Sequence, residues 1–231
     1  MTLLANWKFD WKNSHLNMAR GKGVCLDLGC GDGRHRKVIE DAGWTYIGCD
    51  IDKSRGGATI VYDGKRLPFT DKSIDNVVIW QVLEHVNDPN ATLHEIRRVL
   101  ADGGSVYGSV SCMEPFHDEC MYYGFTGAGI KCALLGAGFR EVELSSGINA
   151  FSLILRGLLI RLLPKKWGER AAFIIARIGI VALVYPIFYL RAVTSLIRRG
   201  HLSDDFVKAR EYIAEVAPFH FAGHIQFVAT A

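Results

Sequence analysis

The residues of this chain with the clearest chemical potential gather at positions 24–33, where a short apolar run ends in a glycine-rich stretch. The run carries an acid, Asp27, and Gly29, Gly31 and Gly33 follow it at alternate positions. Glycines permit a tight turn and let the main chain approach a ligand closely. A second acid, Asp50, ends the next apolar run, at the spacing where a carboxylate binds ribose hydroxyls. The pattern predicts a nucleotide-like ligand at this loop.

Two classes of ligand compete for such a loop. A dinucleotide site uses Gly-x-Gly-x-x-Gly, which would need a third glycine at position 34. The chain has Arg34 there and places its third glycine at position 33. The spacing therefore disfavours a nicotinamide oxidoreductase, although a glycine-rich loop alone is a weak signal.

Several motifs in order make residues 20–145 resemble the class I methyltransferases that depend on S-adenosylmethionine (SAM), in particular those acting on small molecules and lipids. The motifs are Asp-Leu-Gly-Cys-Gly-Asp-Gly at 27–33, Asp50-Ile51, Asp63-Gly64 before Leu67-Pro-Phe69, the run from Ser73 to His85, and Gly103-Gly104. The resemblance implies a Rossmann-like fold, SAM as the cofactor and methyl transfer as the reaction. Glu84-His85 is typical of this branch, and the residues leave open whether His85 is structural or contacts a ligand.

The resemblance also implies which residues bind the cofactor. They are Asp27, Gly29, Cys30, Gly31, Gly33, Asp50, Ile51, Asp63, Gly64 and Gln81. Within this set, the acid before the loop and the loop backbone would hold the methionine part of SAM. Asp50 would bind the ribose, Ile51 would pack on the adenine, and Gln81 would line the pocket.

The stretch after the apolar run 105–110 is rich in groups that can take or share a proton. These groups are His117, Asp118, Glu119, Tyr122 and Tyr123. In related methyltransferases a similar stretch borders the acceptor pocket. Because SAM is a strong electrophile, a base is needed only where the acceptor nucleophile carries a proton. His117 is the candidate base, with a structural or substrate-packing role as the alternative, and Gly124 stands where the family usually has a basic residue.

Short apolar runs alternate with amphipathic stretches over the first 149 residues, and this predicts an α/β fold with a mainly parallel sheet. Strands are expected at 24–28, 44–49, 74–80, 105–110, 139–144 and 224–230, and helices at 34–42, 90–100 and 126–135. With the family resemblance, we expect a Rossmann-like, doubly wound, seven-stranded sheet with a hydrophobic helical insertion before the last strand. The chain would divide into a core at 1–149 with an N-terminal helix, an insertion at 150–212, and a return to the core at 213–231.

The predicted insertion is nearly all apolar, yet a simple membrane crossing conflicts with its place between strands. A return to the same sheet needs an even number of crossings, and a two-helix hairpin would carry Lys165 and Lys166 to the far side, against the positive-inside tendency. Arginines at 170, 177, 191 and 198 share one helical face. This arrangement favours a helix lying in the membrane interface, so we expect peripheral contact through 151–199 on the cytoplasmic face. A soluble lid, a homodimer face and a transmembrane hairpin are the alternatives.

The composition excludes other classes. The net charge of +3 and the lack of aromatic-basic interleaving disfavour a nucleic-acid partner. None of the six cysteines forms a C-x-x-C pair, so we expect no metal site and reduced, cytoplasmic thiols. No secretory signal is expected, since Lys8, Asp10 and Trp11 interrupt the start of the chain.

The leading hypothesis is therefore a SAM-dependent methyltransferase acting on an oxygen or carbon of a small-molecule or lipid-linked acceptor near a membrane. A non-catalytic SAM-fold scaffold that binds a partner through the insertion is the second hypothesis. Asp27, the glycine loop and Asp50 together count against it, because a scaffold has no need of all three. A nicotinamide oxidoreductase is the third.

Overall fold

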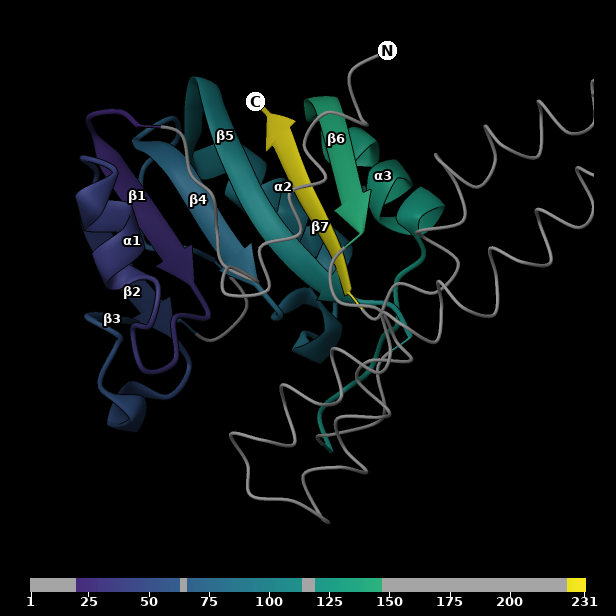
Figure 1. Ribbon diagram of the computed structural model, residues 1–231, viewed down its shortest axis with the longest axis horizontal. Coiled ribbons are helices and arrows are strands. Elements are labelled where there is room, and N and C mark those ends of the chain that lie inside the picture. The colour runs from purple at the N-terminus through teal and green to yellow at the C-terminus, as the bar shows by residue number, and fades with distance from the viewer. Residues whose placement is uncertain (1–19, 63–65, 114–118, 147–223) are drawn as a thin grey trace, which may run out of the picture. The chain divides into compact units, whose positions relative to one another are not determined.

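The computed structural model describes residues 20–62, 66–113, 119–146 and 224–231 (Figure 1). Its strands are β1 (Val24–Leu28), β2 (Thr45–Asp50), β3 (Ile60–Val61), β4 (Ile74–Trp80), β5 (Leu100–Ser111), β6 (Arg140–Ser146) and β7 (His224–Thr230). Its helices are α1 (Arg36–Asp41), α2 (Pro89–Val99) and α3 (Gly127–Gly136), with short 3-10 turns η1 (Lys53–Arg55) and η2 (Leu83–His85).

The seven strands form one sheet in the order β3-β2-β1-β4-β5-β7-β6 (Figure 1). The pairs among β1 to β5 are parallel, and β7 runs antiparallel to both of its neighbours. The predicted α/β fold with a seven-stranded, mainly parallel sheet is confirmed. The last strand joins this sheet between β5 and β6, as the alternating pattern of 224–230 indicates.

Both faces of the sheet are buried. On one face Cys25 of β1 and Val78 of β4 pack against Ile39 of α1. Side chains of opposite parity, such as Val106 and Phe227, are equally inaccessible, so the other face is covered as well. Figure 1 shows α2 passing behind β5 and β7. This two-sided burial explains why the central strands β1 and β4 read as short continuous apolar runs.

The helix ends follow from local chemistry. The Asp88 side chain caps α2 by accepting from the Ala91 N–H at 2.9 Å, and a proline occupies the first turn, where its missing N–H costs nothing. Thr126 caps α3 by accepting from the Gly129 N–H at 3.0 Å. Both helices therefore begin within a residue of their predicted starts.

Helix α1 and strand β5 begin two or more residues from their predicted starts, and strand β3 was not predicted. Helix α1 begins at Arg36 rather than at 34, because the glycine turn continues through a bond from the Arg36 N–H to the Gly33 carbonyl at 3.0 Å. Strand β5 begins at Leu100, directly after α2, and its pairing with β4 shifts register before Ser105. Gly103, at a φ of +80°, lies in this irregular part. Strand β3 has only two residues, too few for a periodic signal.

The predicted insertion at 150–212 lies outside the described residues, as do all of the residues 151–199 through which membrane contact was predicted. Within the described ranges, no helix has the length and apolar character needed to span a membrane.

The pairing of β5 with β7 yields a stability prediction at Gly108. This residue lies opposite Phe227, and a Cβ added to it would overlap the aromatic ring. We expect Gly108→Ala to lower the free energy of unfolding by about 1–3 kcal/mol, the usual cost of overpacking. Gly136→Ala is the matched control, since a Cβ there meets nothing within 4 Å.

Urea denaturation of both variants measures the difference. In a Phe227→Leu background the loss caused by Gly108→Ala should shrink, because the overlapping ring atoms are gone. Equal losses in the two backgrounds would contradict this packing.

Candidate functional site

The glycine loop lies at the carboxyl end of β1, next to the point where the chain order of the sheet reverses between β1 and β4. Open α/β sheets bind ligands in the crevice beside such a point. Gly29, Gly31 and Gly33 all have positive φ, at +74°, +53° and +76°. A Cβ on Gly29 would also overlap Val82, so the turn after β4 packs directly on the loop. Other residue types would be strained at these positions.

The N–H groups of the glycine loop donate hydrogen bonds to other protein groups. The Gly29 and Cys30 amides both donate to the Cys49 carbonyl, at 2.7 and 3.2 Å. The Gly31 amide donates to the Asp50 carboxylate at 2.8 Å, and the Gly33 amide donates to the Cys30 carbonyl at 2.8 Å. A ligand at these four residues therefore meets carbonyl groups and bare glycine surfaces rather than free N–H donors. Such a loop differs from a phosphate cradle, which relies on backbone N–H groups.

Asp50 closes β2 beside this loop and is 7% exposed. One carboxylate oxygen accepts from Gly31, and the other accepts from the Asp52 N–H at 2.9 Å. A carboxylate has about four acceptor positions, so roughly two remain for a ligand hydroxyl. The next residue, Ile51, is an apolar side chain that is 73% exposed.

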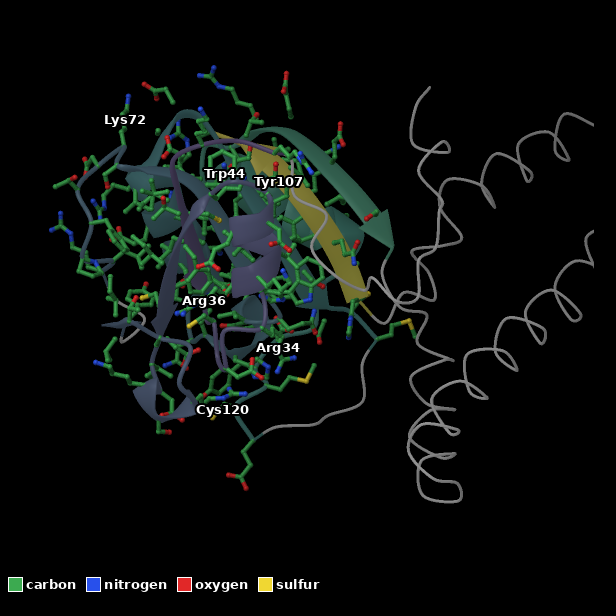
Figure 2. The ribbon with its side chains drawn as sticks, turned by 60° about the vertical axis from the view of Figure 1, so that its left-hand side comes forward. Arg34, Arg36, Trp44, Lys72, Tyr107 and Cys120 are labelled. Carbon is green, nitrogen blue, oxygen red and sulfur yellow. The ribbon has the colours of Figure 1, made fainter. Side chains whose placement is uncertain are left out.

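The Asp27 carboxyl is buried behind polar partners. It is 1% exposed and accepts a hydrogen bond from the Tyr46 hydroxyl at 3.2 Å. The His35 Nδ1 lies 3.5 Å from its other oxygen, in ion-pair range but without hydrogen-bond geometry. Burial and then the Asp27 charge raise the pKa of Tyr46, so its hydroxyl stays protonated and keeps donating. The Arg36 guanidinium, labelled in Figure 2, lies 4.8 Å from the centre of the Tyr46 ring.

Gln81 follows β4 with a φ of +56°, a conformation that non-glycine residues adopt at a cost of about 1–3 kcal/mol and mostly at functional positions. Its N–H donates to the Ser109 carbonyl at 2.8 Å. Its side-chain amide donates from Nε2 to the Ser109 hydroxyl at 2.9 Å and accepts at Oε1 from the Ser111 hydroxyl at 3.2 Å. The β5 hydroxyls thus hold the amide at the ends of the central strands.

The segment 119–126 is fastened to the same end of the sheet. The Tyr122 and Tyr123 amides both donate to the Glu84 carbonyl, at 2.8 and 3.3 Å, and the Phe125 amide donates to the Ser111 carbonyl at 2.8 Å. The His85 Nδ1 lies 3.3 Å from the Cys120 carbonyl, an interaction that supports a structural role for this histidine.

Several of the predicted site residues lie together at the strand ends, and three lie outside the described residues. The structure joins the glycine loop, Asp50 and Gln81 at neighbouring strand ends, with Ile51 beside them. His117, Asp63 and Gly64 lie outside the described residues. Tyr46, His35, Ser109 and Ser111 were missed by sequence reasoning; the serines alternate along β5, which in retrospect marks one face of that strand. The described residues contain no group of three or more His, Cys, Asp or Glu placed to hold a metal ion.

Known proteins with similar sequences include methyltransferases. Residues 26–108 match the family of methyltransferase domains. A Mycolicibacterium smegmatis protein named a probable S-adenosylmethionine-dependent methyltransferase is 35% identical over 147 residues, which cover 53% of this chain and 54% of that protein. Corynebacterium glutamicum demethylmenaquinone methyltransferase is 33% identical over 96 residues, covering 38% of this chain and 41% of that protein. The chain thus spans about half, or less, of the length of these curated relatives.

A solved structure shares the fold. A SAM-dependent methyltransferase from Archaeoglobus fulgidus superposes with a TM-score of 0.56 at 16% identity, covering 92% of this chain and 87% of that one. At this low sequence identity, the structural similarity supports a shared fold and nothing further.

The loop environment predicts unequal cysteine reactivity. Burial, reinforced by the Asp27 charge, raises the pKa of Cys30 to about 11, and burial raises the pKa of Cys49 to about 12. Near pH 7 both stay thiols, and the thiolate that reacts with alkylating reagents forms only as the pH approaches these values. Cys120, at the outer edge in Figure 2, and Cys132 are exposed.

We therefore expect iodoacetamide at pH 7 to modify Cys120 and Cys132 while sparing the buried Cys30 and Cys49. Peptide mass spectrometry of the native protein reads each site, and a denatured sample shows that every thiol can react. Rapid labelling of Cys30 in the native protein would contradict the buried loop.

Proposed function

We propose that this chain, whose residues 26–108 match the family of methyltransferase domains, is an enzyme that transfers a methyl group from SAM to an oxygen or carbon of a small-molecule or lipid-linked acceptor. One observation carries the proposal. The glycine loop, Asp50 and Gln81 follow three neighbouring parallel strands and meet where the strand order reverses. A scaffold would have no use for a strained loop, a strained glutamine and an acid with spare acceptor capacity in one place.

The described residues fit SAM in kind. Asp50 would accept from the ribose hydroxyls with its remaining lone pairs, and the exposed Ile51 would pack on the adenine. The glycine loop would hold the methionine part, whose ammonium group suits carbonyl acceptors. The buried Asp27 would favour that positive charge through space, since a buried charge acts more strongly than one in water. Bound SAM supplies a methyl group on a positively charged sulfur. Asp63 and Gly64 would lie near the adenine.

The acceptor would enter beside the carboxyl end of β5. Tyr122 and Tyr123 are 53% and 39% exposed there, so aromatic surface borders this end of the sheet. Such surface suits an apolar acceptor, and the Corynebacterium relative is named a demethylmenaquinone methyltransferase. His117 would serve as the base where the acceptor nucleophile carries a proton. The insertion would bring the enzyme to the membrane surface on the cytoplasmic side.

Replacing Asp50 tests the cofactor site. We expect Asp50→Ala to weaken SAM binding at least tenfold, because one hydrogen bond to a charged group contributes about 1.5–3 kcal/mol. Asp52→Ala is the matched control, since this nearby acid is exposed and caps only the short turn η1. Isothermal titration with SAM compares both variants with the unchanged protein.

Activity is read with SAM labelled in its methyl group and a whole-cell extract as the source of acceptor. Label in the lipid phase that Asp50→Ala abolishes would support a lipid-linked acceptor, and label in the aqueous phase would support a soluble one. Binding of SAM with no transfer would favour the scaffold. An Asp50→Ala variant that binds as well as Asp52→Ala would overturn the site.

Membrane contact through 151–199 has its own test. The full-length protein should float with vesicles that contain anionic lipid, and less so as salt rises, because basic side chains near the surface are screened. Replacing Arg170, Arg177, Arg191 and Arg198 by glutamine should reduce flotation. Arg34→Gln and Lys72→Gln, at exposed positions of the predicted core domain, should not. Full-length protein that stays with the aqueous fraction would contradict a peripheral site.

A further inference from the structure

Glu84 has a carboxyl group that is buried beside the proposed site, close to Ser111. It lies in η2 and is 0% exposed. Its carbonyl accepts from the Tyr122 and Tyr123 amides, and its carboxyl interacts with the hydroxyl and main chain of Ser111. It thus connects the acceptor-side segment with the strand end that holds Gln81. A lone buried carboxyl is costly, so its position calls for an explanation.

Four side chains form a continuous polar chain from Glu84 through Ser111 and Gln81 to Ser109. The Ser111 hydroxyl donates to Gln81 Oε1 at 3.2 Å, and Gln81 Nε2 donates to the Ser109 hydroxyl at 2.9 Å. A serine hydroxyl has only one proton to donate. Burial favours the neutral form of the Glu84 carboxyl. A neutral carboxyl can donate to the Ser111 hydroxyl, which leaves the serine's own proton for Gln81, in agreement with the Ser111 to Gln81 hydrogen bond.

The reverse arrangement shows what the proton decides. An ionised Glu84 could only accept, so Ser111 would donate to it instead. The Gln81 amide would then turn over, with its nitrogen toward Ser111 and its oxygen toward Ser109. The two ends of an amide have nearly the same shape, so the donors beside it set its direction. The protonation of Glu84 therefore determines which amide atoms have hydrogen-bonding capacity left for a ligand.

We propose that Glu84 is a positioning residue that acts as a neutral acid and, through Ser111, fixes the direction in which the Gln81 amide meets the cofactor. The inference rests on the proposed function in one respect, namely that Gln81 lines the SAM pocket. It adds a residue that touches neither SAM nor acceptor and yet controls one that does.

The surroundings agree with a retained proton. Burial, the largest effect, raises the pKa of Glu84, while nearby main-chain N–H groups and the charge of His85 favour the ionised form and offset part of this rise. Among the described residues, Tyr122 and Tyr123 lie on the segment bound to its carbonyl, and His224 of β7 pairs with Ser111.

Infrared spectroscopy of the full-length protein at neutral pH tests the protonation directly. The carbonyl stretch of a protonated carboxylic acid should be present, should vanish in Glu84→Gln, and should shift in Ser111→Ala, where the acid loses its acceptor. Glu95→Gln is the matched control. Arg98 hydrogen bonds lower the pKa of Glu95, so this residue contributes no such band.

Binding of S-adenosylhomocysteine tests the positioning. Glu84→Gln should stay within about threefold of the unchanged protein, because its amide can donate to Ser111 as the acid does. Glu84→Leu fills similar space without a donor, and it should weaken binding about tenfold, as should Ser111→Ala. The double variant should be no weaker than either single one, since the two residues act through one chain.

A band that survives Glu84→Gln, or unchanged affinity in Glu84→Leu, would overturn the inference, the second because a merely space-filling glutamate would behave in that way. Failure of the unchanged protein to bind S-adenosylhomocysteine would instead refute the proposed function. The infrared measurement would still decide the protonation of Glu84 in that case.

Discussion

The hydrogen bond from the Gly31 amide to the Asp50 carboxylate is the interaction on which the rest of the site depends. It ties the loop after β1 to the last residue of β2, so two separate strand ends become one surface. The Cys49 carbonyl reinforces the link by accepting from the Gly29 and Cys30 amides. Because Asp50 is buried and held by two main-chain hydrogen bonds, a ligand there would meet a preorganised acceptor rather than a mobile side chain.

The second fixed point is the turn after β4, where β5 supplies the restraint. Ser109 and Ser111 lie on the face of β5 opposite to that of Val110, which packs into the core. Their hydroxyls bind the Gln81 side chain, and main-chain bonds at both serines anchor the turn and the segment 119–126. Strain at Gln81 is thus compensated by its neighbours, and strand β5 connects the turn after β4 with the segment 119–126.

Much of this could be predicted from the sequence, since each signal was local. Apolar runs located the strands, and the spacing of glycines and acids located the loop and Asp50. What could not be predicted depends on contacts across the sheet. Tyr46 reaches Asp27, and Ser111 reaches Glu84, over separations that no periodic pattern reports. Strand β3 and the early start of β5 were missed because pairing with a neighbour, rather than local propensity, creates them.

The internal use of the loop amides also bears on which ligand the site accepts. The glycine spacing disfavours a dinucleotide only weakly, whereas the hydrogen bonds give a physical reason. A pyrophosphate needs free N–H donors, and the amides of Gly29, Cys30, Gly31 and Gly33 already donate elsewhere. The charges point the same way, since Asp27 and Asp50 would repel a phosphate and attract a cation. A ligand with ribose hydroxyls and positive charge, and without phosphate, satisfies both constraints.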